Sequence, residues 1–349
     1  MKGTDEHFTA RGLGKVVLLA LLVDLVIYPF SQSARAPAQQ ALPASLLNTA
    51  VTLLLTLPLL KLAQQVKEPG QATGTKVLWG TAALLFACGG GEGIVRAEGF
   101  VRYVSDEPLP HLVVYVLLLA AAFYAMRGGI KALARTSGVL LCLFALSLAM
   151  LVVSNARSMR LENLTAQPFD AVQVASAAWK GFRFPAELAL FFFFAPPAEG
   201  RPRCSYRRTL LLLCGAYLVL TMTAELVMGG QSQIQSQAVH ALSRLGRMSV
   251  FRRLDALHVG VWLLASLAKA SAFGLGLQQA LERLLPEGQR PYADRYALAG
   301  LVLGTMCCAG VPYTAVETTL TVLTALWITG LALAGAKGGK PHETRKTHA

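Results

Sequence analysis

Seven ionisable side chains inside long apolar stretches of this 349-residue sequence are candidates for function. A charge at the centre of a bilayer costs about 3 kcal/mol or more, so such residues face protein or water and often mark binding sites. Glu92 and Arg96 have the spacing of an ion pair on one helix face. Lys269 lies about 21 Å along a helix from Asp255, too deep for its ammonium to reach the headgroups. The seven are Asp24, Glu92, Arg96, Glu98, Glu187, Glu225 and Lys269.

Two of these residues are the strongest candidates for binding, because Asp24 and Glu187 each lie where an apolar stretch is interrupted. For Arg96 and Glu98 a second interpretation stays open, in which both reach the headgroups from the outer end of a span. The run Gly89–Gly93 lies inside an apolar stretch and follows no strand, so it is not a phosphate loop. Its glycines favour either close helix approach or a wide space for a ligand.

Other reactive arrangements are missing from the sequence. The six cysteines and six histidines show neither paired nor metal-ligand spacing, and no Ser/His/Asp or Cys/His arrangement is supported. We therefore expect no enzyme activity, no metal site and no cofactor.

The apolar stretches themselves predict the fold class. A bilayer core about 30 Å thick requires roughly 20 apolar residues per helical span. About ten such stretches are present, and they are continuous rather than alternating, which excludes a membrane barrel. The prediction is an all-α integral membrane protein with one polytopic domain over residues 1–349, made of a cytoplasmic segment (1–12), a ten-helix bundle (13–335) and a basic cytoplasmic tail (336–349).

The short loops between the predicted spans differ in Lys and Arg content on alternate sides, which places both termini in the cytoplasm. The net charge of +13 reflects these loops, and we expect no nucleic-acid binding. Two longer outer loops, near 155–181 and 230–253, each hold a segment with helical periodicity. The predicted spans are Leu13–Phe30, Ser45–Leu62, Val77–Val104, His111–Met126, Thr136–Ser154, Phe182–Pro197, Thr209–Gly229, Leu254–Leu285, Arg295–Gly310 and Tyr313–Gly335.

Two of the spans, the first and the sixth, are irregular. The first contains Asp24 and ends at Tyr28-Pro29, and the sixth has a short apolar run, Pro185–Pro197, after a bend at Gly181–Phe184. Matching irregularities five spans apart predict a 5+5 inverted repeat with broken helices 1 and 6. In such folds the half-helix ends and freed carbonyls form the ligand site. The alternative is that the two prolines only mark helix ends.

Three short motifs carry a family resemblance. The first is Phe251–Leu257 followed by Trp262 and by Lys269–Ser271, the second spans Gly129–Arg135, and the third is Phe182–Glu187. In this order they resemble the endospore germination nutrient-receptor B subunits, a branch of the amino acid–polyamine–organocation transporter superfamily. One departure is Ala186, which stands where that family has glycine.

The resemblance implies a ten-helix fold of the LeuT type with a ligand pocket between helices one, three, six and eight. It also implies a small-molecule germinant, expected to be an amino acid, and association with receptor A and C subunits in the lipid bilayer of the spore inner membrane. The alternative function is a secondary active amino-acid transporter coupled to protons or another cation. The candidate ligand-binding residues are Asp24, Tyr28, Pro29, Gly89, Glu92, Phe184, Ala186, Glu187, Lys269 and Ser271.

The topology can be tested with a single cysteine in the basic tail. In a background without the six native cysteines, Pro341→Cys should react with a membrane-impermeant reagent only after the membrane is opened, because the basic loops are cytoplasmic. Labelling of intact cells would contradict the orientation.

Overall fold

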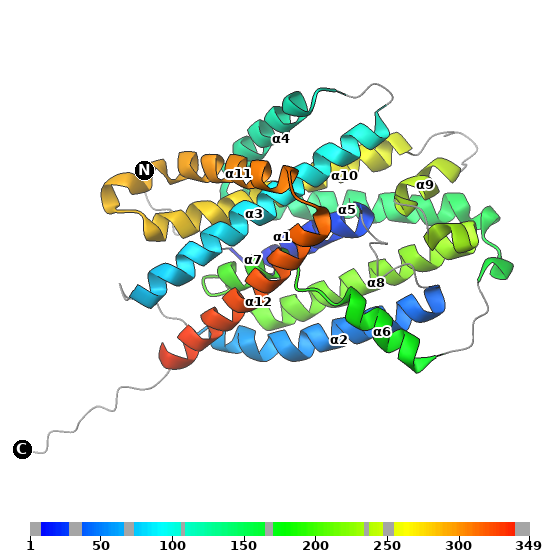
Figure 1. Ribbon diagram of the computed structural model, residues 1–349, viewed down its shortest axis with the longest axis horizontal. Coiled ribbons are helices and arrows are strands. Elements are labelled where there is room, and N and C mark those ends of the chain that lie inside the picture. Colours follow the sequence, from blue (N-terminus) through cyan, green and yellow to red (C-terminus); the bar gives the residue numbers. More distant parts are fainter. Residues whose placement is uncertain are drawn as a thin grey trace, which may run out of the picture.

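The computed structural model describes residues 8–27, 37–65, 73–105, 109–164, 170–233, 237–246 and 255–338. Over these ranges the chain is a bundle of helices (Figure 1). One isolated bridge joins Thr9 and Glu199. The α-helices are α1 (Ala10–Ile27), α2 (Ala38–Ala63), α3 (Thr73–Val104), α4 (His111–Met126), α5 (Gly129–Asn155), α6 (Ala171–Gly181), α7 (Ala186–Phe194), α8 (Pro202–Met228), α9 (Ala238–Leu245), α10 (Asp255–Leu284), α11 (Ala293–Ala309) and α12 (Tyr313–Gly338).

Six of these helices, α2, α3, α5, α8, α10 and α12, are long and apolar enough to cross a membrane. By the length and composition of its helices, the expectation of an all-helical, multi-pass membrane protein is therefore confirmed. Each predicted span overlaps one helix, and the periodic segments of the two longer loops form α6 and α9. The count of ten membrane crossings and the inverted repeat stay predictions.

Several predicted boundaries are wrong in the same direction. The helices α2, α5 and α8 each begin seven residues before the predicted span. Their first turns hold polar or basic residues such as Gln40, Lys131 and Arg203. Hydropathy marks only the part of a helix that lies among apolar groups, whereas the backbone ladder continues into the polar interface.

The predicted interruption of the sixth span is present. After α6 the backbone is extended at Phe182 and Pro185, and α7 begins at Ala186. Proline disfavours helical geometry in the residue before it and lacks a donor N–H, so Pro185 separates the two helices while starting the second. The nine residues of α7 extend about 14 Å, too short to cross a bilayer alone. The counterpart in the first span, Tyr28-Pro29, lies outside the described residues.

One of the seven ionisable residues has a structural role. Glu225 on α8 is 2% exposed, and its carboxylate accepts a hydrogen bond from the backbone N–H of Ala38 at the start of α2. The first N–H groups of a helix have no partner within the helix and carry partial positive charge, so a carboxylate there stabilises the helix end. Glu225 thus fixes α2 against α8.

The glycine run of α3 allows two backbones to touch. A Cβ atom at Gly91 would lie 2.3 Å from the carbonyl carbon of Gly304 on α11, and one at Gly304 would lie 2.1 Å from the carbonyl oxygen of Ala87. A Cβ at Gly89 would meet the ring of Phe273 on α10 at 2.7 Å. Of the two uses left open for these glycines, the structure has close helix approach.

A methyl group at this crossing should destabilise the fold. Gly91→Ala has no room to relax because its neighbours are backbone atoms, and overpacking of this kind costs about 1–3 kcal/mol. The matched control is Gly99→Ala on the same helix, where the new Cβ meets nothing within 4 Å. Thermal unfolding of the purified protein in detergent should show a lower midpoint for the first variant only. Equal midpoints would contradict the close crossing.

Candidate functional site

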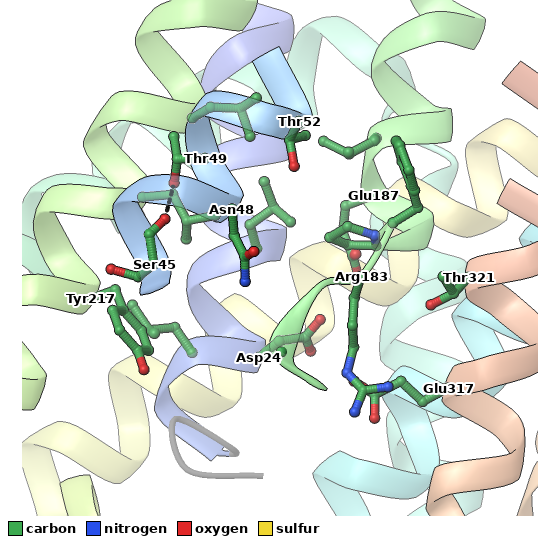
Figure 2. A pocket seen from close by; sticks show the side chains of 18 of the residues that line it. Asp24, Ser45, Asn48, Thr49, Thr52, Arg183, Glu187, Tyr217, Glu317 and Thr321 are labelled. Atoms are coloured by element: carbon green, nitrogen blue, oxygen red, sulfur yellow. Dashed lines mark hydrogen bonds and ion pairs between the residues drawn. The ribbon is translucent and has the colours of Figure 1, made fainter. Parts of the chain in front are cut away.

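The bundle contains a half-open cavity of about 310 Å³. Its lining comes from α1, α2, α3, α6, the connection between α6 and α7, α7, α8 and α12 (Figure 2). Of the helices expected around the ligand pocket, one, three and six (α1, α3 and α7) line this cavity. The eighth predicted span, α10, contributes no described residue to the lining, while α2, α8 and α12 do. The reason is that the ammonium of Lys269 on α10 is covered by carboxylates standing between that helix and the cavity.

The break between α6 and α7 forms one wall of the cavity, with Phe184, Ala186 and Glu187 all lining it. Glu187 lies in the first turn of α7 and is 2% exposed. The sequence placed it in the unwound part, but Pro185 starts the helix before it. A carboxylate in a first helical turn is stabilised by the partial positive charge of the helix end.

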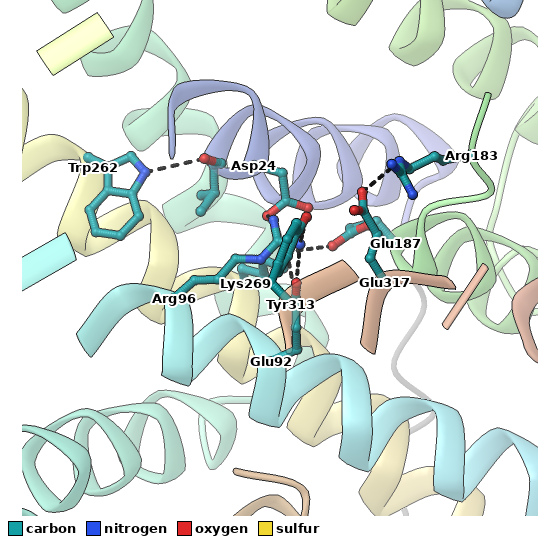
Figure 3. A network of polar contacts seen from close by, with 10 residues as sticks. Asp24, Glu92, Arg96, Arg183, Glu187, Trp262, Lys269, Tyr313 and Glu317 are labelled. Atoms are coloured by element: carbon teal, nitrogen blue, oxygen red, sulfur yellow. Dashed lines mark hydrogen bonds and ion pairs between the residues drawn. The ribbon is translucent and has the colours of Figure 1, made fainter. Parts of the chain in front are cut away.

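A network of five charges borders the cavity (Figure 3). The Nζ atom of Lys269 lies 2.6 Å from Asp24 Oδ1, 2.6 Å from Glu187 Oε1 and 3.9 Å from Glu92 Oε2. Arg96 Nη1 lies 3.1 Å from the same Asp24 oxygen, and Arg96 also pairs with Glu92. These contacts join α1, α3, α7 and α10. Lys269, at 1% exposure, faces the protein interior and pairs with acids as predicted.

The opposite side of the network reaches α12. Arg96 donates a hydrogen bond to the hydroxyl of Tyr313, and its guanidinium carbon lies 4.3 Å from the centre of that ring. One turn further along α12, Glu317 pairs with Arg183 of the α6–α7 connection at 2.8 Å. The interpretation of Arg96 and Glu98 as headgroup-reaching residues is wrong, since they are only 8% and 4% exposed. Instead, the Oε1 atom of Glu98 lies 2.7 Å from Nδ1 of His111.

The wall opposite Glu187 is a polar face of α2, formed by Ser45, Asn48, Thr49 and Thr52 (Figure 2). Ser45 and Thr49 donate their hydroxyl protons to carbonyls of their own helix, at 2.8 and 2.9 Å, which leaves their lone pairs as acceptors. The carboxamide of Asn48 has no hydrogen-bond partner among the described residues, so it offers both donors and an acceptor.

The candidate residues from the sequence divide into three groups. Asp24, Glu92, Phe184, Ala186 and Glu187 line the cavity, and Lys269 stands directly behind them. Gly89 and Ser271 lie away from it: Gly89 packs against Phe273, and the Ser271 hydroxyl donates to the carbonyls of Ala122 and Leu267. Tyr28 and Pro29 lie outside the described residues.

Sequence reasoning missed the contribution of α2 and α12. Glu317 is a charged residue inside the tenth predicted span, and by the cost of intramembrane charge it belonged among the candidates. The polar residues of α2 recur with the spacing of one helix face, a signal that was also readable. Arg183 and Tyr313 gave no such signal, because their roles depend on which helices meet.

The arrangement is suited to a small polar solute. A volume of about 310 Å³ lies at the lower end of the range of about 300–1,000 Å³ for ligand pockets. Carboxylates can receive an ammonium, and Arg183 and the first N–H groups of α7 can receive an anionic group. No group of three or more His, Cys, Asp or Glu side chains in the described part of the chain is arranged to hold a metal ion.

Comparisons with known proteins give a distant likeness. No protein-family model and no curated protein matches the sequence. Among solved structures, that of a manganese transporter from Eremococcus coleocola, in complex with an aromatic bis-isothiourea substituted compound, is similar over 93% of this chain and 76% of that chain. The sequence identity is 15% and the TM-score 0.45, and at that level the likeness carries no argument about fold or function.

Removal of the buried ammonium should destabilise the folded protein. Lys269→Met leaves three carboxylates facing Arg96 alone, and breaking a buried ion pair costs about 3–5 kcal/mol. Membrane insertion should be intact or improved, because the variant removes a charge. Lys180→Met on the exposed side of α6 is the control, with a change within about 0.5 kcal/mol.

Addition of Asp24→Asn to the Lys269→Met variant should recover part of the loss, since it removes one of the carboxylates left without their ammonium. The unfolding midpoints of the native protein, the two single variants and the double variant are measured in detergent. Equal midpoints for Lys269→Met and Lys180→Met would show that the network does not stabilise the fold.

Proposed function

We propose that the protein binds a small amino acid in this cavity and acts as the membrane subunit of a spore germinant receptor. The observation that carries the binding proposal is the cavity itself, which lies at a broken helix and is bordered by paired buried charges. Binding changes the activity of a receptor only if one state of the bundle binds the ligand better than another. Ion pairs that join four helices next to the ligand give such a difference a physical basis.

The ligand is placed by its charges. Its ammonium goes to the carboxylates of Glu187 and Asp24, and its carboxylate goes to Arg183 and the N-terminus of α7, whose first residues line the cavity. Its side chain then points to the polar face of α2 around Asn48 and Thr52. A small side chain with a hydrogen-bonding group fits that wall best.

The receptor part of the proposal is supported by the motif resemblance along the sequence. One residue of these motifs, Trp262, also joins two helices, because its indole N–H donates to the carbonyl of Val23 on α1 at 3.3 Å. A receptor subunit should co-purify with A- and C-type subunits, and their genes should flank its own. The proposed location is the spore inner membrane with both termini cytoplasmic.

The second candidate is a secondary active amino-acid transporter. It is favoured by the ion pairs that tie α1, α3, α7 and α10 together at the cavity wall, because alternating access needs contacts that can break and re-form around the substrate. Uptake of a labelled amino acid by vesicles that contain only this protein would favour the transporter. Binding without uptake would favour the receptor.

The binding proposal is tested by a screen of the purified protein against single amino acids, followed by Glu187→Gln. If Glu187 receives the ammonium, the affinity should fall by about 1.5–3 kcal/mol, the value of a hydrogen bond to a charged group, or roughly 10- to 150-fold in Kd. The control is Glu162→Gln on the exposed 3-10 turn Leu161–Asn163, which should not change Kd. An unchanged Kd in Glu187→Gln, or no binding of any amino acid by the native protein, would contradict the proposal.

A further inference from the structure

The charges beside the cavity alternate in sign along their contacts. Glu187 contacts Lys269, Lys269 contacts Asp24, Asp24 contacts Arg96, and Arg96 contacts Glu92. The series begins and ends on a carboxylate, so three acids face two cations.

The surrounding groups do not cancel this difference, because the N-terminus of α7 beside Glu187 supplies only about half a positive charge. Arg183 and Glu317 pair with each other at 2.8 Å and add no net charge. Tyr313 on α12 accepts a hydrogen bond from Arg96, and Cys214 and Tyr217 on α8 line the cavity as neutral groups. With every acid ionised, the described groups that face the cavity therefore carry one excess negative charge. An uncompensated charge away from water costs several kcal/mol and is neutralised where a proton or counter-ion can reach it.

The excess negative charge is compensated least at the carboxylate that contacts the fewest cations. Asp24 lies within 4 Å of both Lys269 and Arg96, and so does Glu92. Glu187 contacts Lys269 alone among the described cations, and it lines the cavity that a solute would enter. Glu187 is therefore the acid at which a proton or an ammonium is best accommodated.

We infer that Glu187 carries a proton when the cavity is empty and that the ammonium of the bound solute replaces this proton. The inference rests on the proposed function and specifies its ligand as a compound with a protonated amine. No covalent bond of the solute changes: the Glu187 O–H bond breaks, the proton passes to water or buffer, and one positive charge takes the place of another. The charge around Glu187 and Lys269 is thus the same before and after binding, while the carboxylate of the amino acid is met separately by Arg183 and the N-terminus of α7.

Infrared difference spectroscopy tests the empty state, because the C=O stretch of a buried protonated carboxyl is separate from the bands of carboxylates. The ligand-free native protein should show one such band near neutral pH, and Glu187→Gln should lose it. Glu92→Gln should lose it as well, since that variant removes the excess charge while leaving Glu187 in place. The double variant Arg183→Gln/Glu317→Gln removes one acid and one cation, so it should keep the band.

The bound state is tested with the amino acid that binds in the screen. Its addition should abolish the band, and calorimetric titration in phosphate and in Tris should show close to one proton released per amino acid bound. A native protein without the band, a band that persists in Glu187→Gln or Glu92→Gln, or a band that persists when the amino acid is bound would each overturn the inference. If no amino acid binds, the proposed function fails, while the spectra of the empty protein still decide where the proton is.

Discussion

The structure depends on the burial of one ammonium group. Lys269 lies in the middle of a 30-residue helix with 1% of its surface exposed, so its charge must be met by other parts of the protein. The acids that meet it come from α1, α3 and α7. Each contact requires its helix to lie at one distance and one depth relative to α10. The ion pairs therefore specify an arrangement of four helices that apolar packing alone leaves less well defined.

The cavity follows from a second constraint, the separation of α6 from α7. Because Pro185 ends one helix and starts the next, α6 leaves the axis of α7 and lies beside α2 (Figure 1). A continuous helix would fill this space with its own side chains. The polar residues of α2 then face an opening rather than lipid, which is where hydroxyl and amide groups are tolerated at this depth.

Much of the fold could be predicted from the sequence, because apolar runs and prolines act locally. The break before Ala186 follows from the cost of proline within a helix, and the interior position of Lys269 follows from the cost of a charge in lipid. The pairing of Lys269 with Asp24 joins residues 245 positions apart and needs knowledge of which helices meet. The polar face of α2 was overlooked for another reason: single hydroxyl residues are common in apolar helices, where they bond to their own backbone as Ser45 and Thr49 do. Only the periodic recurrence distinguishes such a face.

The contact of backbones at Gly91 and Gly304 has a mechanical consequence. Side chains between two helices can change rotamer and let the helices slide, but two backbones in contact have no such layer. The helices α3 and α11 should therefore shift together as one stiff body, carrying Glu92 and Arg96 with them. The helices α2 and α12 meet the cavity through side chains and make no such backbone contact at this crossing, so they can shift more readily. The cavity wall should thus be rigid where α3 supplies Glu92 and Arg96, and more compliant where α2 supplies its polar residues.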